Sequence, residues 1–319
     1  MRTRRSQPSS NSVPSEDGRE ELREGHRGVL LHEIVRELVR SLSDTIVDAT
    51  LGGANHALSL AQKLGARGTF IGFDADGEAI ERARTALSGV KPQVQLVHAN
   101  FRHMEKHLKG LAVASVDAFL FDLGWSAHQL ESGRGFSFRS DEPLLMTYDS
   151  HPDALALTAR TIVNEWGEES IADILFGWGE EKFSRRIARA IVARRKEKPI
   201  EIASDLAHIV EKAVPHYRMR GKIHPATKTF QALRIAVNDE MGALSEGLEA
   251  AKEFATSGAR IATVTFHSIE DRLVKRTFQE WSREGWGTLA VKKPIKPSRE
   301  EIKENPRARS AKLRIIRKT

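Results

Sequence analysis

Residues 45–74 read TIVDATLGGANHALSLAQKLGARGTFIGFD, and this stretch decides the fold. It begins with a β-rich run at 45–50, which is followed by a turn containing Gly52 and Gly53. Residues 56–64 read as a helix, and residues 68–74 form a second apolar run that ends at Asp74. A strand, a helix and a second strand at this spacing predict a parallel β-α-β unit with a right-handed crossover.

The same alternation continues on both sides of this unit. Before it, the apolar residues Leu30, Ile34, Val35 and Leu38 recur at helical spacing. After it, the sequence predicts further elements: a helix at 78–87 and strands at 94–97, 116–121 and 260–266. Strands that alternate with helices in this way indicate an α/β fold with a mostly parallel sheet.

A long helical block interrupts the alternation. Between Ala154 and Val214 the apolar positions follow a helical period, and one long helix is predicted from Phe230 towards Phe254. Because the strand at 260–266 resumes the α/β pattern, the block is predicted to be an insertion. We therefore expect a disordered tail, a discontinuous sheet domain and an inserted helical substrate-recognition domain, at residues 1–25, 26–145 with 230–319, and 146–229 respectively.

Composition limits the functions open to a chain of 319 residues. The absence of cysteine excludes disulfides, thiolate metal sites and cysteine nucleophiles. No run reaches the ~18 consecutive apolar residues of a membrane helix, so no membrane association is expected. The 12 histidines include no H-E-x-x-H pattern, and no metal site is predicted. The net charge of +7 favours a polyanionic partner.

The predicted strands end in residues suited to a nucleoside ligand, because ligands of parallel sheets bind at the carboxyl ends of the strands. Small residues after the first strand let the backbone approach a ligand closely, although a plain tight turn would look the same. Asp74 can accept both hydroxyls of a ribose, and Phe101 can pack on an adenine. The alternative for Asp74 is an ordinary capping aspartate, and the alternative for Phe101 is packing in the core. Asp122 ends an apolar strand, where a buried charge needs a partner.

The loop after the first strand does not contain the G-x-G-x-x-G pattern that binds a pyrophosphate. A dehydrogenase that binds a dinucleotide is therefore disfavoured. Taken together, the strand ends favour an adenosyl ligand without a pyrophosphate. The sequence therefore predicts S-adenosylmethionine as the cofactor of a class I methyltransferase with a Rossmann-like sheet.

Several longer motifs lie at residues 47–52, 122–124, 134–138, 179–183, 185–191, 224–227, 229–240, 266–272 and 305–314. They extend over nearly all of the chain from His26 onwards. In content and in order these motifs resemble the MraW/RsmH-type methyltransferases, which modify the exocyclic N4 amine of a cytosine in small-subunit (16S) ribosomal RNA.

The resemblance implies a class I methyltransferase fold with an inserted all-helical substrate domain. It also implies the small ribosomal subunit as the partner and a cytoplasmic location, and it leaves a monomer and a homodimer open. The cofactor contacts of the family map onto seven positions of this chain, namely Ala54, Asn55, His56, Asp74, Phe101, Asp122 and Gln129.

The sequence departs from the family pattern around the predicted crevice. Ala54 and Asn55 stand in the cofactor loop where the family has glycine. Leu145 and Thr147 replace a carboxylate and a guanidinium, and Gly28 replaces a proline. These changes raise an alternative hypothesis, a catalytically weakened relative that binds RNA during ribosome assembly.

Methyl transfer to a cytosine amine is a matter of alignment, because the sulfonium donor needs no activation of its leaving group. An acceptor that holds the amine protons also stabilises the growing positive charge, and the candidates for this catalytic role are Asp122 and the turn Leu123-Gly124. For Asp122, a contact to the cofactor is favoured over direct catalysis. The base must be unstacked to be reached, and aromatic residues could stack on it. The candidates are Trp125, Phe136 and Phe138, with His267 and Ser268 as further lining residues.

Basic residues are concentrated in two segments. Arg185, Arg186 and Arg189 share one face of a predicted helix, opposite Ile187 and Ile191. A second basic segment extends over residues 292–318. Together the segments favour a phosphate-binding surface over a solvated helix face, and such contacts orient RNA without reading its sequence.

Overall fold

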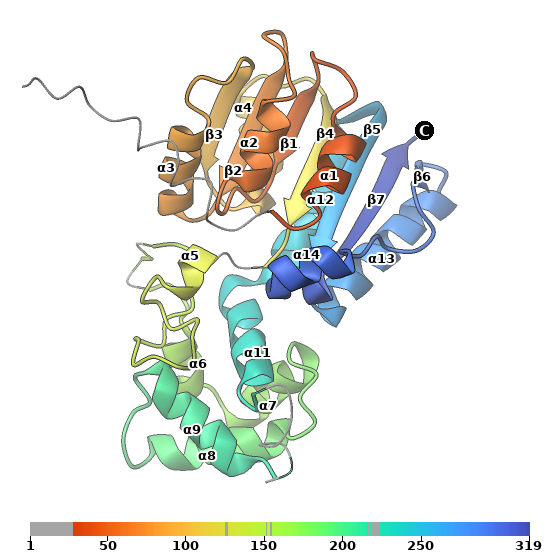
Figure 1. Ribbon diagram of the computed structural model, residues 1–319. Helices are drawn as coiled ribbons and strands as arrows, with labels where there is room; N and C mark the ends of the chain where they lie inside the picture. Colours follow the sequence, from red (N-terminus) through yellow and green to blue (C-terminus); the bar gives the residue numbers. More distant parts are fainter. Residues whose placement is uncertain (1–27, 125–126, 151, 154, 216, 218–223) are drawn as a thin grey trace, which may run out of the picture.

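The computed structural model describes residues 28–319, apart from residues 125, 126, 151, 154, 216 and 218–223 (Figure 1). The predicted tail at 1–25 and the candidate Trp125 therefore lie outside the described residues. The sheet domain is built on seven strands in the order β3-β2-β1-β4-β5-β7-β6. Their bounds are Thr45–Asp48 (β1), Thr69–Asp74 (β2), Gln93–His98 (β3), Val116–Asp122 (β4), Ala255–Thr265 (β5), Gly287–Leu289 (β6) and Lys312–Lys318 (β7).

Strands β1 to β5 are parallel, whereas β7 is antiparallel to both of its neighbours. The chain begins in the middle of the sheet at β1, moves outwards to β3, and then returns to β4 on the other side of β1. Ligands of such sheets bind where the strand order reverses, beside the carboxyl ends of β1 and β4. Asp48 and Asp122 end these two strands.

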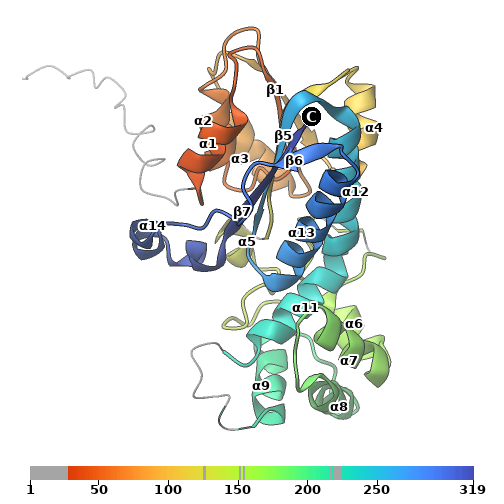
Figure 2. The same ribbon diagram turned by 90° about the vertical axis from the view of Figure 1, so that its right-hand side faces the viewer.

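Helices cover both faces of the sheet. Side chains alternate between the faces along each strand, so the apolar residues of a strand contribute to two cores. Ile46 packs with the cluster that contains Ile34 and Leu60, while Val47 packs with the opposite cluster around Leu248. The first face is covered by α1 (Leu31–Leu38), α2 (Asn55–Ala61) and α3 (Gly77–Ala86), and the second by α4 (Met104–Gly110), α12 (Glu240–Phe254) and α13 (Ser268–Arg283), as Figure 2 shows.

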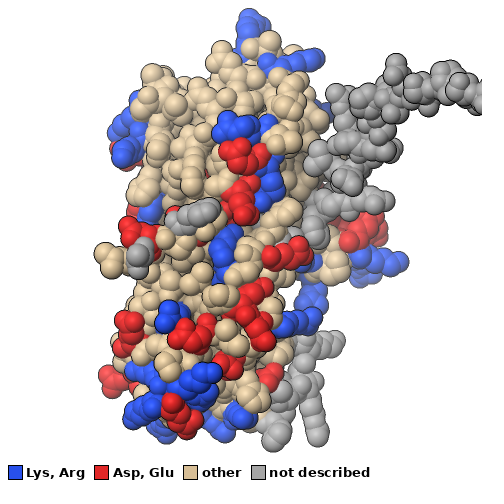
Figure 3. All heavy atoms as spheres, turned by 90° about the vertical axis from the view of Figure 1, so that its left-hand side faces the viewer, with Lys and Arg blue, Asp and Glu red and all other residues tan. Residues whose placement is uncertain are grey.

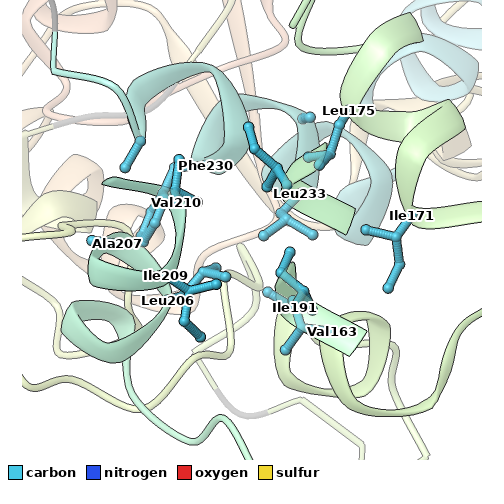
Figure 4. Packing of buried hydrophobic residues seen from close by; sticks show 14 of the residues in the cluster. Val163, Ile171, Leu175, Ile191, Leu206, Ala207, Ile209, Val210, Phe230 and Leu233 are labelled. Carbon is cyan, nitrogen blue, oxygen red and sulfur yellow. The ribbon is translucent and has the colours of Figure 1, made fainter. Parts of the chain in front are cut away.

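A helical unit lies between β4 and β5 in the sequence and below the sheet in Figure 1. It consists mainly of α6 (Ala159–Glu165), α7 (Glu168–Gly177), α8 (Ser184–Arg195), α9 (Ala203–Ala213) and α11 (Thr227–Asn238). Leu175, Ile191 and Leu233 meet in its core from three of these helices (Figure 4). This apolar core draws residues from Phe136 to Leu233, and the domain boundaries at 145/146 and 229/230 stay a prediction.

The single long helix predicted from Phe230 to Phe254 is wrong, because α11 ends at Asn238 and α12 begins at Glu240. Asp239 between them has a left-handed backbone, with φ 44° and ψ 50°. Aspartate tolerates this conformation better than most residues. Its carboxylate Oδ2 accepts a 2.6 Å hydrogen bond from Arg102, which lies 137 residues earlier in the chain. The break turns the chain from the helical unit back to the sheet.

Part of the basic segment at 292–318 belongs to the sheet rather than to a free surface. Leu313 and Ile315 of β7 are buried, and Asp271 of α13 pairs with Lys312 and Arg314 at 2.8 and 2.7 Å. Apart from Arg317, the exposed basic residues of this segment lie before β7, in the loop that contains Lys292, Lys293 and Lys296, on α14 (Arg299–Glu304) and on the 3-10 turn η4 (Pro306–Ser310). Figure 2 shows this arm extending from the sheet domain.

Candidate functional site

A cavity of about 1220 Å³ lies at the carboxyl ends of the central strands. His56, Asp74, Phe101 and Asp122 all line it, although they follow or end four different strands. Asn55 and Gln129 line it as well. Six of the seven predicted cofactor contacts therefore meet in one cavity. Ala54 is not among the lining residues, and its side chain is buried in the core beneath α2.

The loop after β1 brings backbone groups to the cavity. Ala54 precedes α2 with φ 63° and ψ 10°, a left-handed conformation in which an L-residue other than glycine is strained. This turn places Asn55 and His56 in the first turn of α2, at the cavity wall. Helix N-termini present unpaired N–H groups, so this end of the cavity favours ligand groups that accept hydrogen bonds.

Asp74 at the end of β2 binds the loop after β1 through a hydrogen bond. Its Oδ2 accepts a 2.8 Å hydrogen bond from Gly52 N, and its Oδ1 accepts a 2.9 Å bond from Asp76 N. Burial raises the pKa of Asp74 above its ordinary value, although these two hydrogen bonds oppose the shift. Carboxylate oxygens have more than one lone pair each, so Asp74 can still accept from a ligand.

Phe101 follows β3 and is held by two contacts of the sheet domain. Its ring meets Phe121 of β4 edge to face, with centroids 5.6 Å apart. Gly247 of α12 lies behind it, and a Cβ at that position would come within 2.7 Å of the Phe101 ring. The absence of a side chain at 247 therefore sets how deep the ring sits in the cavity wall.

The side chains of Asp122 and His56 contact each other at the cavity. His56 Nδ1 lies 3.2 Å from Asp122 Oδ2, and the two side chains are 7% and 24% exposed. The other carboxylate oxygen, Oδ1, is buried and has no hydrogen-bond partner among the described residues. The backbone N–H of Asp122 donates to Thr50 Oγ1 at 2.7 Å, which ties β4 to the loop after β1.

Asp48 lies beneath this pair at the end of β1 and is fully buried. Its Oδ1 accepts a 3.0 Å hydrogen bond from Thr50 N, while its Oδ2 has no partner among the described residues. Burial raises the pKa of Asp48 to about 7, against the effect of the Thr50 N–H and of His56. Asp48 therefore exchanges a proton near neutral pH.

The far wall of the cavity is a polar network that joins the helical unit to the sheet domain. Arg234 of α11 donates two hydrogen bonds to Glu240 of α12, at 2.7 and 2.9 Å, and both side chains are nearly buried. The Tyr148 hydroxyl donates to Glu240 at 2.8 Å. Asn238 accepts from Tyr148 N and donates to Met146 O. Tyr148, Asn238 and Glu240 line the cavity.

Other predicted lining residues pack elsewhere. Phe136 stacks on Tyr148, and Phe138 stacks on His224 with centroids 4.4 Å apart, so both belong to the helical core. His267 caps α13, and Ser268 donates to Glu180 at 2.7 Å. None of these four residues is among the described residues that line the cavity.

Three groups that could ligate a metal lie close together, namely Glu240, His267 and Glu270. The Glu240 carboxylate is already bound by Arg234, and Glu270 forms a capping box with His267. Pairing and helix capping account for this arrangement, and we assign no metal to it.

The family follows from comparison with known proteins. Residues 23–319 match the model of the MraW methylase family. The chain belongs to the MraW methylase family. It is 43% identical over 309 residues to the ribosomal RNA small subunit methyltransferase H of Brevibacillus brevis, with 92% of this chain and 98% of that protein covered. The protein of the same name from Lactobacillus johnsonii is 42% identical over 314 residues, with the same coverage of both chains.

This result confirms the family, the α/β methyltransferase fold and the cofactor S-adenosylmethionine that the sequence predicts. Which residues of this MraW methylase hold the cofactor stays a prediction. Among the described residues, no helix has the length and apolar character needed to cross a bilayer.

Sequence reasoning missed several residues of the site in this MraW methylase. Asp48 precedes the cofactor loop directly, and its position at a strand end was the available signal. Asn238 and Glu240 lie in the longest family motif, at 229–240, but periodicity alone places them inside a helix. Their role depends on the break at Asp239, which no local pattern announces.

Proposed function

We propose that this MraW methylase transfers a methyl group from S-adenosylmethionine to the exocyclic N4 amine of a cytosine in small-subunit ribosomal RNA. The names of relatives that are 42% and 43% identical support the RNA substrate. The observation that carries the choice of an amine is that Asp122 lines the cavity and that its Oδ1 has no hydrogen-bond partner among the described residues. An amine has N–H donors for such an oxygen. A cytoplasmic location accompanies this substrate.

The cavity has room for two ligands. Its volume of about 1220 Å³ exceeds the ~300–1,000 Å³ of a pocket for one small molecule. A base whose amine is paired in a helix cannot reach an active site, so the target must be unstacked and inserted. The volume therefore supports a cofactor and a single inserted base side by side.

The residues around the cavity fit S-adenosylmethionine. Asp74 would accept from the ribose hydroxyls, and Phe101 would pack against the adenine. Asn55, His56 and Gln129 would complete the contacts, with Ala54 acting through the backbone turn it forms. When bound, the cofactor supplies a methyl group on a positively charged sulfur. The sulfur leaves as a neutral thioether, which is a good leaving group.

Asp122 is the proposed catalytic residue. Its Oδ1 would accept a hydrogen bond from the cytosine amine and hold the nitrogen in place. This contact localises the nitrogen lone pair and stabilises the positive charge that grows on the amine. Asp122 then takes the proton that the amine loses once the new N–C bond has formed. His56 occupies Oδ2, so the two carboxylate oxygens have separate partners.

Basic surfaces on both units would orient the RNA. Arg185 and Arg186 of α8 are exposed opposite the buried Ile187 and Ile191, and Figure 3 shows Lys and Arg side chains gathered at the lower end of the molecule, over the helical unit. On the C-terminal arm, Arg307 lines the cavity. Phosphate contacts of this kind predict an affinity for RNA that falls steeply with salt.

The test uses small ribosomal subunits from a strain that lacks the enzyme. The purified protein and S-adenosylmethionine are expected to add one methyl group to a cytosine N4, mapped by mass spectrometry. Asp122→Asn is expected to bind the cofactor and to lose at least 100-fold in transfer rate, a typical effect of removing a general base. Transfer at the wild-type rate by this variant would remove Asp122 from catalysis. If the protein binds the subunits without the cofactor and adds no methyl group, the result would favour the alternative, a catalytically weakened relative that binds RNA during ribosome assembly.

A further inference from the structure

Both ring nitrogens of His56 face atoms that accept hydrogen bonds. Nε2 lies 3.0 Å from the backbone oxygen of Val29, and Nδ1 lies 3.2 Å from Asp122 Oδ2. A carbonyl oxygen can only accept, so Nε2 must carry a proton. A neutral ring would then turn the lone pair of Nδ1 towards the lone pairs of the carboxylate, which is repulsive. A second proton on Nδ1 changes this repulsion into a charge-assisted contact.

We infer that His56 is an imidazolium cation in the resting protein and acts as a positioning residue, which holds the Asp122 carboxylate in place and keeps its Oδ2 occupied. Oδ1 is then left as the acceptor for the substrate. The role given to Oδ1 rests on the proposed function, whereas the charge of His56 rests on the geometry of the protein alone.

The surroundings of His56 favour the cation electrostatically. In the described part of the chain, the titratable groups that act on the ring are Asp122 from β4 and Asp48 from β1. Burial disfavours the charged ring, but the Asp122 carboxylate and then Asp48 outweigh it and raise the pKa of His56 above its ordinary value. The ring is only 7% exposed, so water does not replace either contact easily.

The position of the ring is fixed from the side of Val29 as well. Gly28 packs against the imidazole, and a Cβ at that position would come within 2.9 Å of Nε2. The next backbone group, Leu30 N, donates a 2.7 Å hydrogen bond to Glu301 Oε1 of the C-terminal arm. The Val29 carbonyl is therefore held in place by a residue more than 270 positions away. The ring cannot turn away from Asp122 without losing the Val29 contact.

The charge of His56 can be measured directly by ¹⁵N NMR of the cofactor-free protein labelled in histidine. The His56 signals are assigned by their loss in His56→Gln. His224 is an internal reference, because its Nδ1 accepts a hydrogen bond from Ala226 N and therefore carries no proton. At pH 7.5 both nitrogens of His56 are expected to be protonated, in contrast to those of His224. A His56 ring with one protonated nitrogen at this pH would overturn the inference.

The variant Asp122→Asn tests whether the Asp122 carboxylate is the cause of the positive charge on His56. An opposite charge at this distance raises the pKa of a histidine, so this variant should lower the titration midpoint of His56. Asp117→Asn, at the other end of β4, is the matched control and should leave the midpoint in place. An unchanged midpoint in Asp122→Asn would refute the pairing. These readouts need neither cofactor nor RNA, so a failed methylation assay would leave them intact.

A kinetic readout separates positioning from a structural role. With saturating substrates, the single-turnover rate of the wild type should fall as pH rises through the midpoint measured by NMR. His56→Gln should be slower and should lose this alkaline limb, while its circular dichroism confirms that it is folded. A His56→Gln variant with the wild-type pH profile would contradict the positioning role even if His56 proves to be charged.

Discussion

Replacing Asp48 by asparagine tests the electrostatics beneath the cavity through the stability of the protein. The pKa of Asp48 rises from 3.8 to about 7 on burial, and a difference of this size corresponds to about 4 kcal/mol. Below pH 4 both the folded and the unfolded chain carry the proton. As pH rises to 7 the unfolded chain loses it first, so the folded state binds more protons and the free energy of unfolding falls. Above pH 7 the loss is complete.

Asparagine has the same shape, keeps an oxygen that can accept from Thr50 N, and does not titrate. Asp48→Asn should therefore gain stability relative to the wild type as pH rises, by about 2 to 3 kcal/mol between pH 5 and pH 8. Urea unfolding followed by circular dichroism at both pH values measures the difference. Any constant cost of the buried amide cancels between them. A difference that is the same at both pH values, or that shrinks as pH rises, would refute the raised pKa.

Three further substitutions have defined outcomes. Ala54→Gly removes the cost of a left-handed alanine at φ 63°, so urea unfolding should show a gain of about 1 kcal/mol; no gain would mean that the turn is unstrained. Gly247→Ala places a Cβ 2.7 Å from Phe101, and calorimetric titration should show weaker cofactor binding at a stability cost of about 1–3 kcal/mol; unchanged affinity would separate Phe101 from the cofactor. Arg234→Met leaves Glu240 buried without its cation and should destabilise by about 3–5 kcal/mol. Arg234→Met combined with Glu240→Gln should recover part of this loss, and strict additivity would contradict the pairing.

The sheet domain could be predicted well from the sequence, because its signals are local. The strands that end at Asp74 and Asp122 contain unbroken buried runs at 70–73 and 118–121, and the residues after them gather at one edge by the geometry of parallel strands. The elements that were missed have conflicting local signals. Strand β7 carries Lys312 and Arg314 between its buried residues, and this charge made it look like a free basic surface.

The missed parts of the site depend on contacts between distant segments. Asp239 breaks a helical pattern because Arg102 binds its carboxylate from another element. Glu240 becomes part of the cavity wall only after this break, together with Tyr148. Propensity and periodicity describe neighbours in the sequence, so they cannot report partners that lie about a hundred or more residues away.

The bond between Leu30 N and Glu301 has a consequence for the order in which the fold forms. It joins residues 271 positions apart, so the ordering of the Val29 segment depends on one of the most distant contacts in the chain. Strands β1 to β4 pair over shorter separations and can form without it. The backbone oxygen that faces His56 therefore gains this support only from a helix that follows all five parallel strands in the sequence.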